Sequence, residues 1–270
     1  MESLELDIPK TIDELIDLYL SIDLQVTCKG DKPTSLEYYR HQFMIKILIH
    51  IFSLKTLYFG YNHKGRAVKD YSGVLVITRS ILEAFLLFYF IFYEPSDPGE
   101  KELRFLLWER EGLVTRQHFD AQTEETRSKQ KDECISLIDI CEKIEASKYF
   151  EPYKKKFKLN IGKYKNLGSW HPTFRSLIDH AKFREYPKNI LYSHLSSHAH
   201  TEYNNLLQSS AMLRETDGDG PFDQSYYMVF SICYTFIFYF IFGTETQYKL
   251  TVDEILNIKK WKSVLIEELD

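Results

Sequence analysis

The chain has 270 residues, of which 44% are apolar, 27% charged and 15% aromatic, and its formal net charge is −5. This length can bury a substantial core in one large domain or two small ones, and eleven glycines and eight prolines are too few for a disordered, fibrous or turn-rich all-β chain. The acidic N-terminus, interrupted by Pro9, lacks the pattern of a signal peptide. A Walker loop, a dinucleotide fingerprint and an H-E-x-x-H motif are absent from the sequence.

The four cysteines are Cys28, Cys134, Cys141 and Cys233, and no two of them form a C-x-x-C pair. Cys134 and Cys141 lie seven residues apart, so a helix would place both on one face. We therefore expect buried thiols and a cytoplasmic location, where thiols stay reduced.

Apolar residues repeat at helical spacing along most of the chain, and prolines and glycines separate the segments. Helices are expected over residues 11–24 (with Thr11 and Glu14 as a capping box), 35–59, about 70–93, 100–147 with a break within 122–132, 174–181, about 186–213, 222–242 and 251–269. Residues 152–168 are expected to be irregular, and no segment alternates convincingly with period two.

The predicted fold class is therefore all-α: a single multi-helix bundle with long central apolar helices. One domain is expected over residues 1–270. Residues 1–60 would form its N-terminal helices, 70–245 the core that carries the motifs, and 250–270 the C-terminal helix.

Two segments raise the question of a membrane. Residues 74–92 contain 15 apolar residues out of 19 but include Arg79 and Glu83, and residues 224–244 are uncharged for 21 positions. A helix that is apolar all round also suits the centre of a bundle, which is the interpretation we favour. A span near residues 224–244 stays as an alternative.

The helix around residues 74–92 has one polar stripe, formed by Arg79 and Glu83 at positions i and i+4. An unpaired charge inside a bundle costs several kcal/mol, so other polar groups must meet these two. The best candidate partner is the segment 192–200, with the sequence YSHLSSHAH.

A helical projection of this segment places Tyr192 and Ser196 toward the core, with His200 at the edge of the same face. The same projection places His194 and His198 on the opposite side. The sequence thus predicts a cluster of Arg79, Glu83, Tyr192, Ser196 and His200.

Three motifs carry a resemblance: Arg79-x-x-x-Glu83, the stretch 170–181 (WHPTFRSLIDHA), and Tyr192-x-x-Leu-Ser196-x-x-Ala-His200. Together they resemble an uncharacterised bacterial helical family that pairs an R-x-x-x-E helix with a later Y-x-x-L-S-x-x-(small apolar)-H helix. The resemblance covers roughly residues 40–245. The family has no settled activity, and such families often occur near bacterial stress and antiviral genes.

Arg175 and His180 add a second resemblance, to the R-x(4)-H spacing of the HEPN superfamily of helical ribonucleases and toxins. This resemblance implies ribonuclease activity and a homodimer with the active site at its interface. The alternative is that Arg175 forms an ordinary ion pair with Asp179 on the outer face of its helix.

A basic segment lies between these motifs and consists of Lys154, Lys155, Lys156, Lys158, Lys163 and Lys165. Three aromatic residues, Tyr153, Phe157 and Tyr164, are interleaved with the lysines. This pattern suits single-stranded RNA, which binds to cationic grooves with stacking platforms. A solvated lysine-rich loop is the alternative.

The leading hypothesis is a metal-independent ribonuclease-type effector, a toxin or antiviral defence protein. Glu83 would orient His200 for proton transfer, and Arg79 would stabilise charge on the phosphoryl group. No cofactor or metal is expected, and the expected partners are RNA, a second copy of the chain and a regulatory protein. The alternatives are a non-enzymatic interaction or sensor module with an architectural polar network, and a membrane-acting effector.

Overall fold

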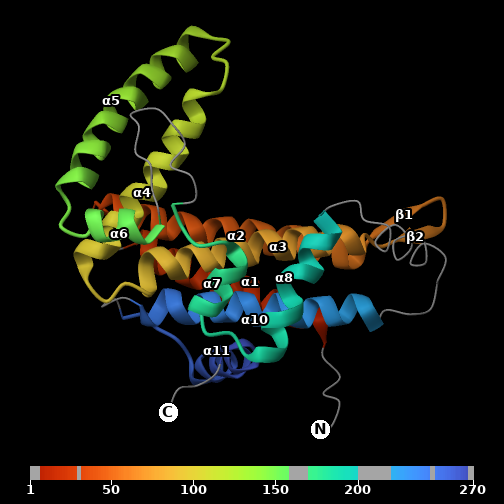
Figure 1. Cartoon of the computed structure of the whole chain (residues 1–270). Coiled ribbons are helices and arrows are strands. Elements are labelled where there is room, and N and C mark those ends of the chain that lie inside the picture. Colours follow the sequence, from red (N-terminus) through yellow and green to blue (C-terminus); the bar gives the residue numbers. More distant parts are fainter. Residues whose placement is uncertain (1–6, 29–31, 158–169, 200–219, 244–246, 267–270) are drawn as a thin grey trace. The chain divides into compact units, whose positions relative to one another are not determined.

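Helices form nearly all of the regular structure in the part of the chain that can be described (Figure 1). The computed structural model describes residues 7–28, 32–157, 170–199, 220–243 and 247–266. Its helices are α1 (Ile8–Thr27), α2 (Ser35–Phe59), α3 (Tyr71–Phe88), the π-helical turn η1 (Tyr89–Tyr93), α4 (Pro98–Gln117), α5 (Glu124–Ala146), α6 (Phe150–Phe157), α7 (Phe174–His180), α8 (Glu185–Ala199), α10 (Gly220–Phe242) and α11 (Val252–Leu265). The predicted all-α class is confirmed.

The chain divides into two compact units. The first combines residues Met1–Tyr89 and Ile178–Asp270, and the second consists of residues Phe90–Leu177. The first unit therefore contains both ends of the chain, whereas the second is built from one continuous stretch.

Aromatic packing forms the core of the first unit, where α3 packs against α2, α8 and α10. The rings of Phe88 on α3 and Phe236 on α10 lie 4.7 Å apart between centroids. The hydroxyl of Tyr19 on α1 donates to the carbonyl oxygen of Cys233 at 3.0 Å, so this buried phenol satisfies its polar atom against the backbone of α10.

Trp261 attaches α11 to α10 in the same unit. Its ring lies 5.5 Å from that of Phe230, 5.8 Å from that of Tyr227 and 6.1 Å from that of Tyr234, with the last pair nearly parallel. Stacked and edge-to-face aromatic pairs add to the stability gained from burial alone. This cluster explains how α11 is held against α10.

Capping residues set several helix ends and correct the sequence-based boundaries. The expected capping box at Thr11 and Glu14 is wrong, because α1 begins one turn earlier, where the Asp7 side chain accepts from the backbone of Lys10. The α2 boundaries are confirmed, and Thr34 forms the capping box there with Glu37. The break between α4 and α5 covers residues 118–123, earlier than expected.

Two strands between α2 and α3 escaped the sequence analysis. Strands β1 (Tyr61–His63) and β2 (Arg66–Val68) pair antiparallel, with Tyr61 opposite Val68. Gly60 ends α2 at a φ of 67°, and a Cβ at this position would lie 2.6 Å from the carbonyl oxygen of Val68. Only glycine fits this approach without strain.

Three of the described helical segments are long and apolar enough to cross a bilayer, judged by length and composition alone: Ser35–Phe59, Tyr71–Tyr93 and Asp223–Phe242. The sequence analysis had singled out the second and third. In the third, 78% of the apolar window is buried inside the protein, against 33% for α2. The outer face of α2 thus leaves Ile49, Phe52 and Phe59 exposed.

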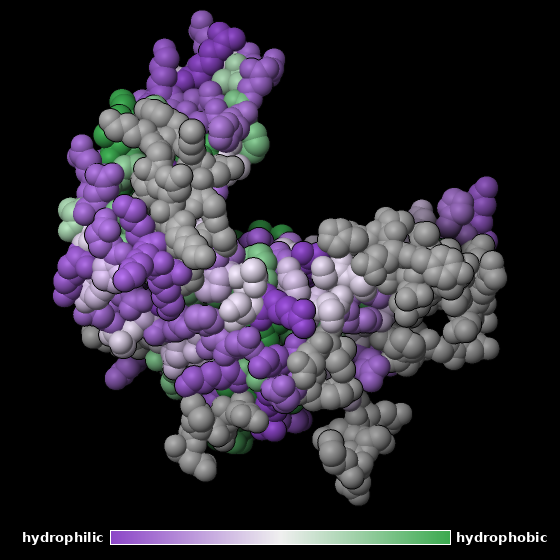
Figure 2. All heavy atoms as spheres, in the orientation of Figure 1, coloured by the Kyte–Doolittle hydropathy of each residue, from purple (hydrophilic) through white to green (hydrophobic). Residues whose placement is uncertain are grey.

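In the second unit, α4 pairs with α5 along its length. The surface over these two helices is mainly hydrophilic in Figure 2, with scattered apolar residues. Cys134 and Cys141 on α5 are half-buried and Cys28 is exposed, so among the four free cysteines only Cys233 meets the expectation of a buried thiol.

Candidate functional site

The Arg79–Glu83 pair forms one face of the candidate site, on α3. Nε of Arg79 donates to Oε1 of Glu83 at 2.8 Å. The two side chains are 21% and 27% exposed, so the pair lies at the margin of the core rather than deep within it. The i,i+4 spacing explains this geometry, because residues one turn apart share a helix face.

Tyr192 completes the contact from α8, which packs against α3. Its hydroxyl accepts a hydrogen bond from Nη2 of Arg79 at 3.3 Å, and the guanidinium carbon lies 5.4 Å from the centroid of its ring. The guanidinium is therefore held along one edge by a carboxylate and faced by an aromatic ring. The structure thus brings together three of the residues singled out from the sequence.

These contacts keep Arg79 cationic. Burial lowers the pKa of its guanidinium, but the hydrogen bonds and charges of Glu83 and Tyr192 outweigh that effect. The pKa of Arg79 is consequently raised above its ordinary value. A fixed, permanently charged and partly exposed guanidinium is a suitable anchor for a phosphate or carboxylate.

The orientation of α8 differs from the helical projection. Among the α8 residues whose side chains are described, Leu191, Leu195 and His198 are buried, at positions i, i+4 and i+7, so His198 does not point outward as expected. The His198 ring instead packs edge-on against Tyr71 at the start of α3, 5.5 Å away between centroids. His194 neighbours His198 at 5.0 Å, and burial lowers the pKa of His194.

Ser196 and His200 are the remaining members of the predicted cluster. Ser196 is half-buried one turn after Tyr192. Within the described part of the chain, no hydrogen bond joins Ser196 to Arg79 or Glu83. His200 lies outside the described residues, so its place in the cluster stays a prediction.

The Arg175 and His180 pair lies on α7, a helix of seven residues. Five residues of helix rotate a side chain by about 140° from its starting direction, so the two do not share a face. Arg175 is exposed, and the expected partner Asp179 instead pairs with Lys188 at 2.7 Å. The expected ion pair between Arg175 and Asp179 is thus replaced by one that links α7 to α8.

The first lysines of the basic segment lie on the helix α6. The expectation that residues 152–168 are irregular is therefore wrong for residues 152–157. Lys155 and Lys156 are exposed, and Lys154 lies 3.4 Å from Glu151. Tyr153 is buried and donates to the carbonyl oxygen of Trp170 at 3.0 Å, so it is not available to stack on a base. The later lysines, Lys158, Lys163 and Lys165, lie outside the described residues.

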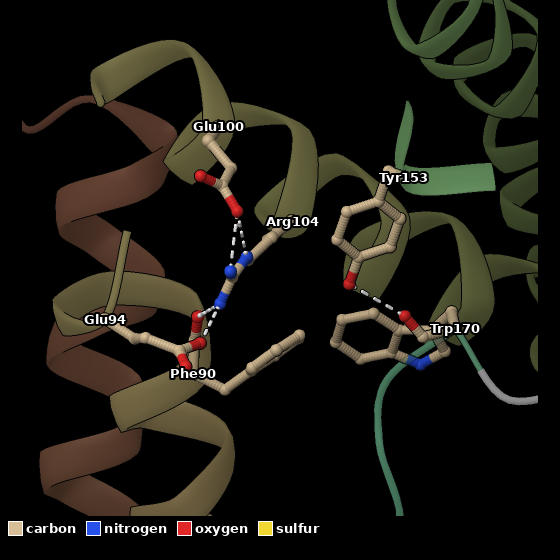
Figure 3. A network of polar contacts seen from close by, with 6 residues as sticks. All are labelled: Phe90, Glu94, Glu100, Arg104, Tyr153 and Trp170. Carbon is tan, nitrogen blue, oxygen red and sulfur yellow. Dashed lines mark hydrogen bonds and ion pairs between the residues drawn. The ribbon is translucent and has the colours of Figure 1, made fainter. Parts of the chain in front are cut away.

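The sequence analysis missed a second arginine network, in the second unit (Figure 3). Arg104 on α4 donates through Nη2 to Glu100 at 2.6 Å, and through Nη1 to the carbonyl oxygen of Phe90 at 2.7 Å and to Glu94. Its guanidinium lies 4.1 Å from the centroid of the Phe90 ring. The Glu100–Arg104 spacing was the available signal, because it matches that of Arg79 and Glu83.

The described residues also bear on whether a group of side chains could hold a metal ion. Among the residues that the structure describes, no group of three or more His, Cys, Asp or Glu side chains could hold a metal ion. The polar contact described between α3 and α8 supplies a guanidinium, a carboxylate and a phenol.

The fold and the site define an all-helical protein with an arginine-centred polar contact between two packed helices. The chain belongs to a family of unknown function, DUF5677, whose model matches residues 66–220. This region includes α3 and α8 and therefore all three residues of the contact, whereas α1, α2 and α11 lie outside it. The expected membership of an uncharacterised helical family is thus confirmed, and no curated protein and no solved structure matches the chain.

Proposed function

We propose that the protein is a metal-independent ribonuclease-type effector, acting in the cytoplasm as a toxin or antiviral defence protein, with its reaction centre at the α3–α8 contact. The observation that carries the proposal is the state of Arg79. Its guanidinium is oriented by Glu83 and Tyr192, yet one-fifth of its side chain stays exposed. A pre-oriented cation of this kind can stabilise charge that develops on a phosphoryl group.

The proposed reaction is transesterification of the RNA backbone. The ribose 2′-oxygen loses its proton to a base and attacks the adjacent phosphorus. The bond to the 5′-oxygen breaks, the 5′-oxygen takes up a proton, and the products are a 2′,3′-cyclic phosphate and a 5′-hydroxyl. Arg79 stabilises the added negative charge on the non-bridging oxygens. His200, predicted from the sequence, is assigned the proton transfer, and Lys155 and Lys156 add cationic surface suited to an RNA backbone.

The test is incubation of the purified protein with total RNA, with and without a chelator. Cleavage that persists with chelator is expected for the wild type. Arg79→Met should reduce the rate by about 100-fold or more, as loss of a charge-stabilising donor does elsewhere. His200→Ala should abolish cleavage, and Tyr192→Phe, which keeps the ring but loses the hydroxyl, should have a smaller effect.

The matched control is Lys143→Met on α5, which removes a cation from an exposed i,i+4 pair with Asp139. This variant should cleave RNA like the wild type. Equal cleavage by the folded Arg79→Met, His200→Ala and control variants would refute the proposal, as would wild-type protein that leaves all RNA intact.

A second candidate function is a non-enzymatic interaction or sensor module. The Arg104 network supports it, because there a buried arginine is held between two carboxylates in the arrangement expected of a structural contact. On this hypothesis, Arg79→Met lowers the free energy of unfolding and nuclease activity is never detected.

The exposed apolar face of α2 supports a third candidate, a membrane-acting effector. Fractionation separates this candidate from the other two. A membrane-acting protein is recovered with the membrane fraction and released by detergent, whereas a ribonuclease acting on cytoplasmic RNA is recovered in the supernatant.

A further inference from the structure

A cavity of about 390 Å³ opens in the first unit, where the end of α1, the start of α2 and the end of α10 come together. Its walls include Thr27, Pro33, Tyr38, Arg40, Phe240 and Tyr248. This volume lies in the range of small-molecule sites, which combine apolar walls with a few placed polar groups. The lining residues lie outside the region matched by the family.

Arg40 is the central polar group of this cavity. Its side chain is buried, with 9% of the residue exposed, and Nη2 donates to the carbonyl oxygen of Phe240. The guanidinium carbon lies 4.5 Å from the centroid of the Phe240 ring. Burial lowers the pKa of Arg40 to about 10, so the group still carries its charge at neutral pH.

The charge of Glu37 acts on Arg40 and raises its pKa, against the larger effect of burial, but the carboxylate itself is hydrogen-bonded to another residue. Glu37 accepts from the backbone nitrogen and the hydroxyl of Thr34, both at 2.9 Å, and so caps α2. Asp23 pairs with His41 at 2.6 Å. No ion pair to Arg40 exists within the described ranges, although a buried arginine ordinarily requires an anionic partner.

The rim of the cavity adds positive charge and aromatic surface. Lys32 is exposed at the rim, and Tyr38 is half-exposed on the first turns of α2. The rings of Phe240 and Tyr248 lie 6.0 Å apart between centroids and form an opposing wall. The lining therefore offers two cations, one carboxylate engaged in a cap, and flat apolar surfaces.

We propose that this cavity binds a small organic anion with a planar ring. Its carboxylate or phosphate is held by Arg40 and Lys32, and its ring packs among Tyr38, Phe240 and Tyr248. A guanidinium fork matches both kinds of anion in a bidentate geometry. The site is separate from the α3–α8 contact, so this proposal does not depend on the proposed ribonuclease activity.

The test is thermal unfolding of the full chain during titration with benzoate, with adenosine monophosphate and with chloride at matched ionic strength. Benzoate carries the carboxylate and adenosine monophosphate the phosphate, so the two arms distinguish the anionic group. A saturable rise in Tm with either probe, and none with chloride, is the expected result. If neither benzoate nor adenosine monophosphate gives a saturable rise in Tm, the proposal is overturned.

Substitutions of the residues that line the cavity test whether the probes bind there. Arg40→Gln and Lys32→Gln should each weaken the apparent affinity by about tenfold or more, as expected for the loss of a charge-assisted hydrogen bond. Lys55→Gln, an exposed cation on the same helix, is the matched control and should bind like the wild type. If Arg40→Gln does not fold, the affinity is measured in the rim variants Lys32→Gln and Tyr38→Ala instead. Wild-type affinity in both rim variants would refute binding in this cavity.

Discussion

Replacement of Arg104 by methionine tests how much the network in Figure 3 stabilises the second unit. Methionine keeps the length and packing of the arginine stem but removes the cation. The carbonyl oxygen of Phe90 then loses a donor at 2.7 Å, and the carboxylates of Glu94 and Glu100 lose their ion pairs with the guanidinium.

The expected cost follows from burial. Breaking a fully buried ion pair by removing one partner costs about 3–5 kcal/mol. The Arg104 side chain is only 6% exposed, but Glu94 and Glu100 are 24% and 31% exposed and can recover part of their hydration. We therefore expect the free energy of unfolding to fall by about 2–4 kcal/mol, measured by urea denaturation.

Two comparisons make this prediction specific. Lys143→Met removes a cation at the same i,i+4 spacing from an exposed pair and should leave the urea midpoint nearly unchanged. Adding Glu100→Gln to Arg104→Met should recover part of the loss, because one unpaired carboxylate is removed. Equal midpoints for Arg104→Met and Lys143→Met would refute the reasoning from burial.

Three further outcomes are expected. Burial lowers the pKa of His50, whose Nε2 lies 3.0 Å from the Ser80 hydroxyl, so the unfolded chain takes up the proton first as the pH falls. Stability from this site is present above about pH 6.5 and is lost below it, and His50→Gln should reduce the difference between urea midpoints at about pH 7.5 and about pH 5.5. Thiol labelling of the native protein should modify exposed Cys28 but spare Cys233, because burial raises the pKa of the Cys233 thiol; labelling of both at equal rates would contradict its burial. Gly60→Ala should lower the free energy of unfolding by about 1–3 kcal/mol, since its Cβ would lie 2.6 Å from a carbonyl oxygen of β2, and an unchanged melting temperature would show that this turn relaxes.

Local patterns in the sequence explain what could be predicted. Apolar spacing that stops at Gly60 located α2 to the residue, because periodicity and helix-ending glycines act within a few positions. The Arg79–Glu83 pair followed from the same local rule. The contact with Tyr192 followed from the argument that a charge in an apolar helix needs a partner.

Nonlocal contacts explain what could not be predicted. Arg40 donates to the carbonyl oxygen of Phe240, and Arg104 donates to that of Phe90. Every residue has a backbone carbonyl, so the type and spacing of residues do not reveal such acceptors. The rotation of α8 was misjudged because serine and histidine occur on both of its faces, so the buried side depends on which neighbour it packs against. His198 is buried for this reason.

The placement of the tryptophans gives each compact unit its own optical reporter. Trp261 is the single tryptophan of the first unit, whereas Trp108 and Trp170 both belong to the second. In a chain carrying phenylalanine at positions 108 and 170, all indole emission comes from Trp261, which packs against the aromatic rings of α10. Loss of order in the first unit thus becomes visible by fluorescence without a contribution from the second.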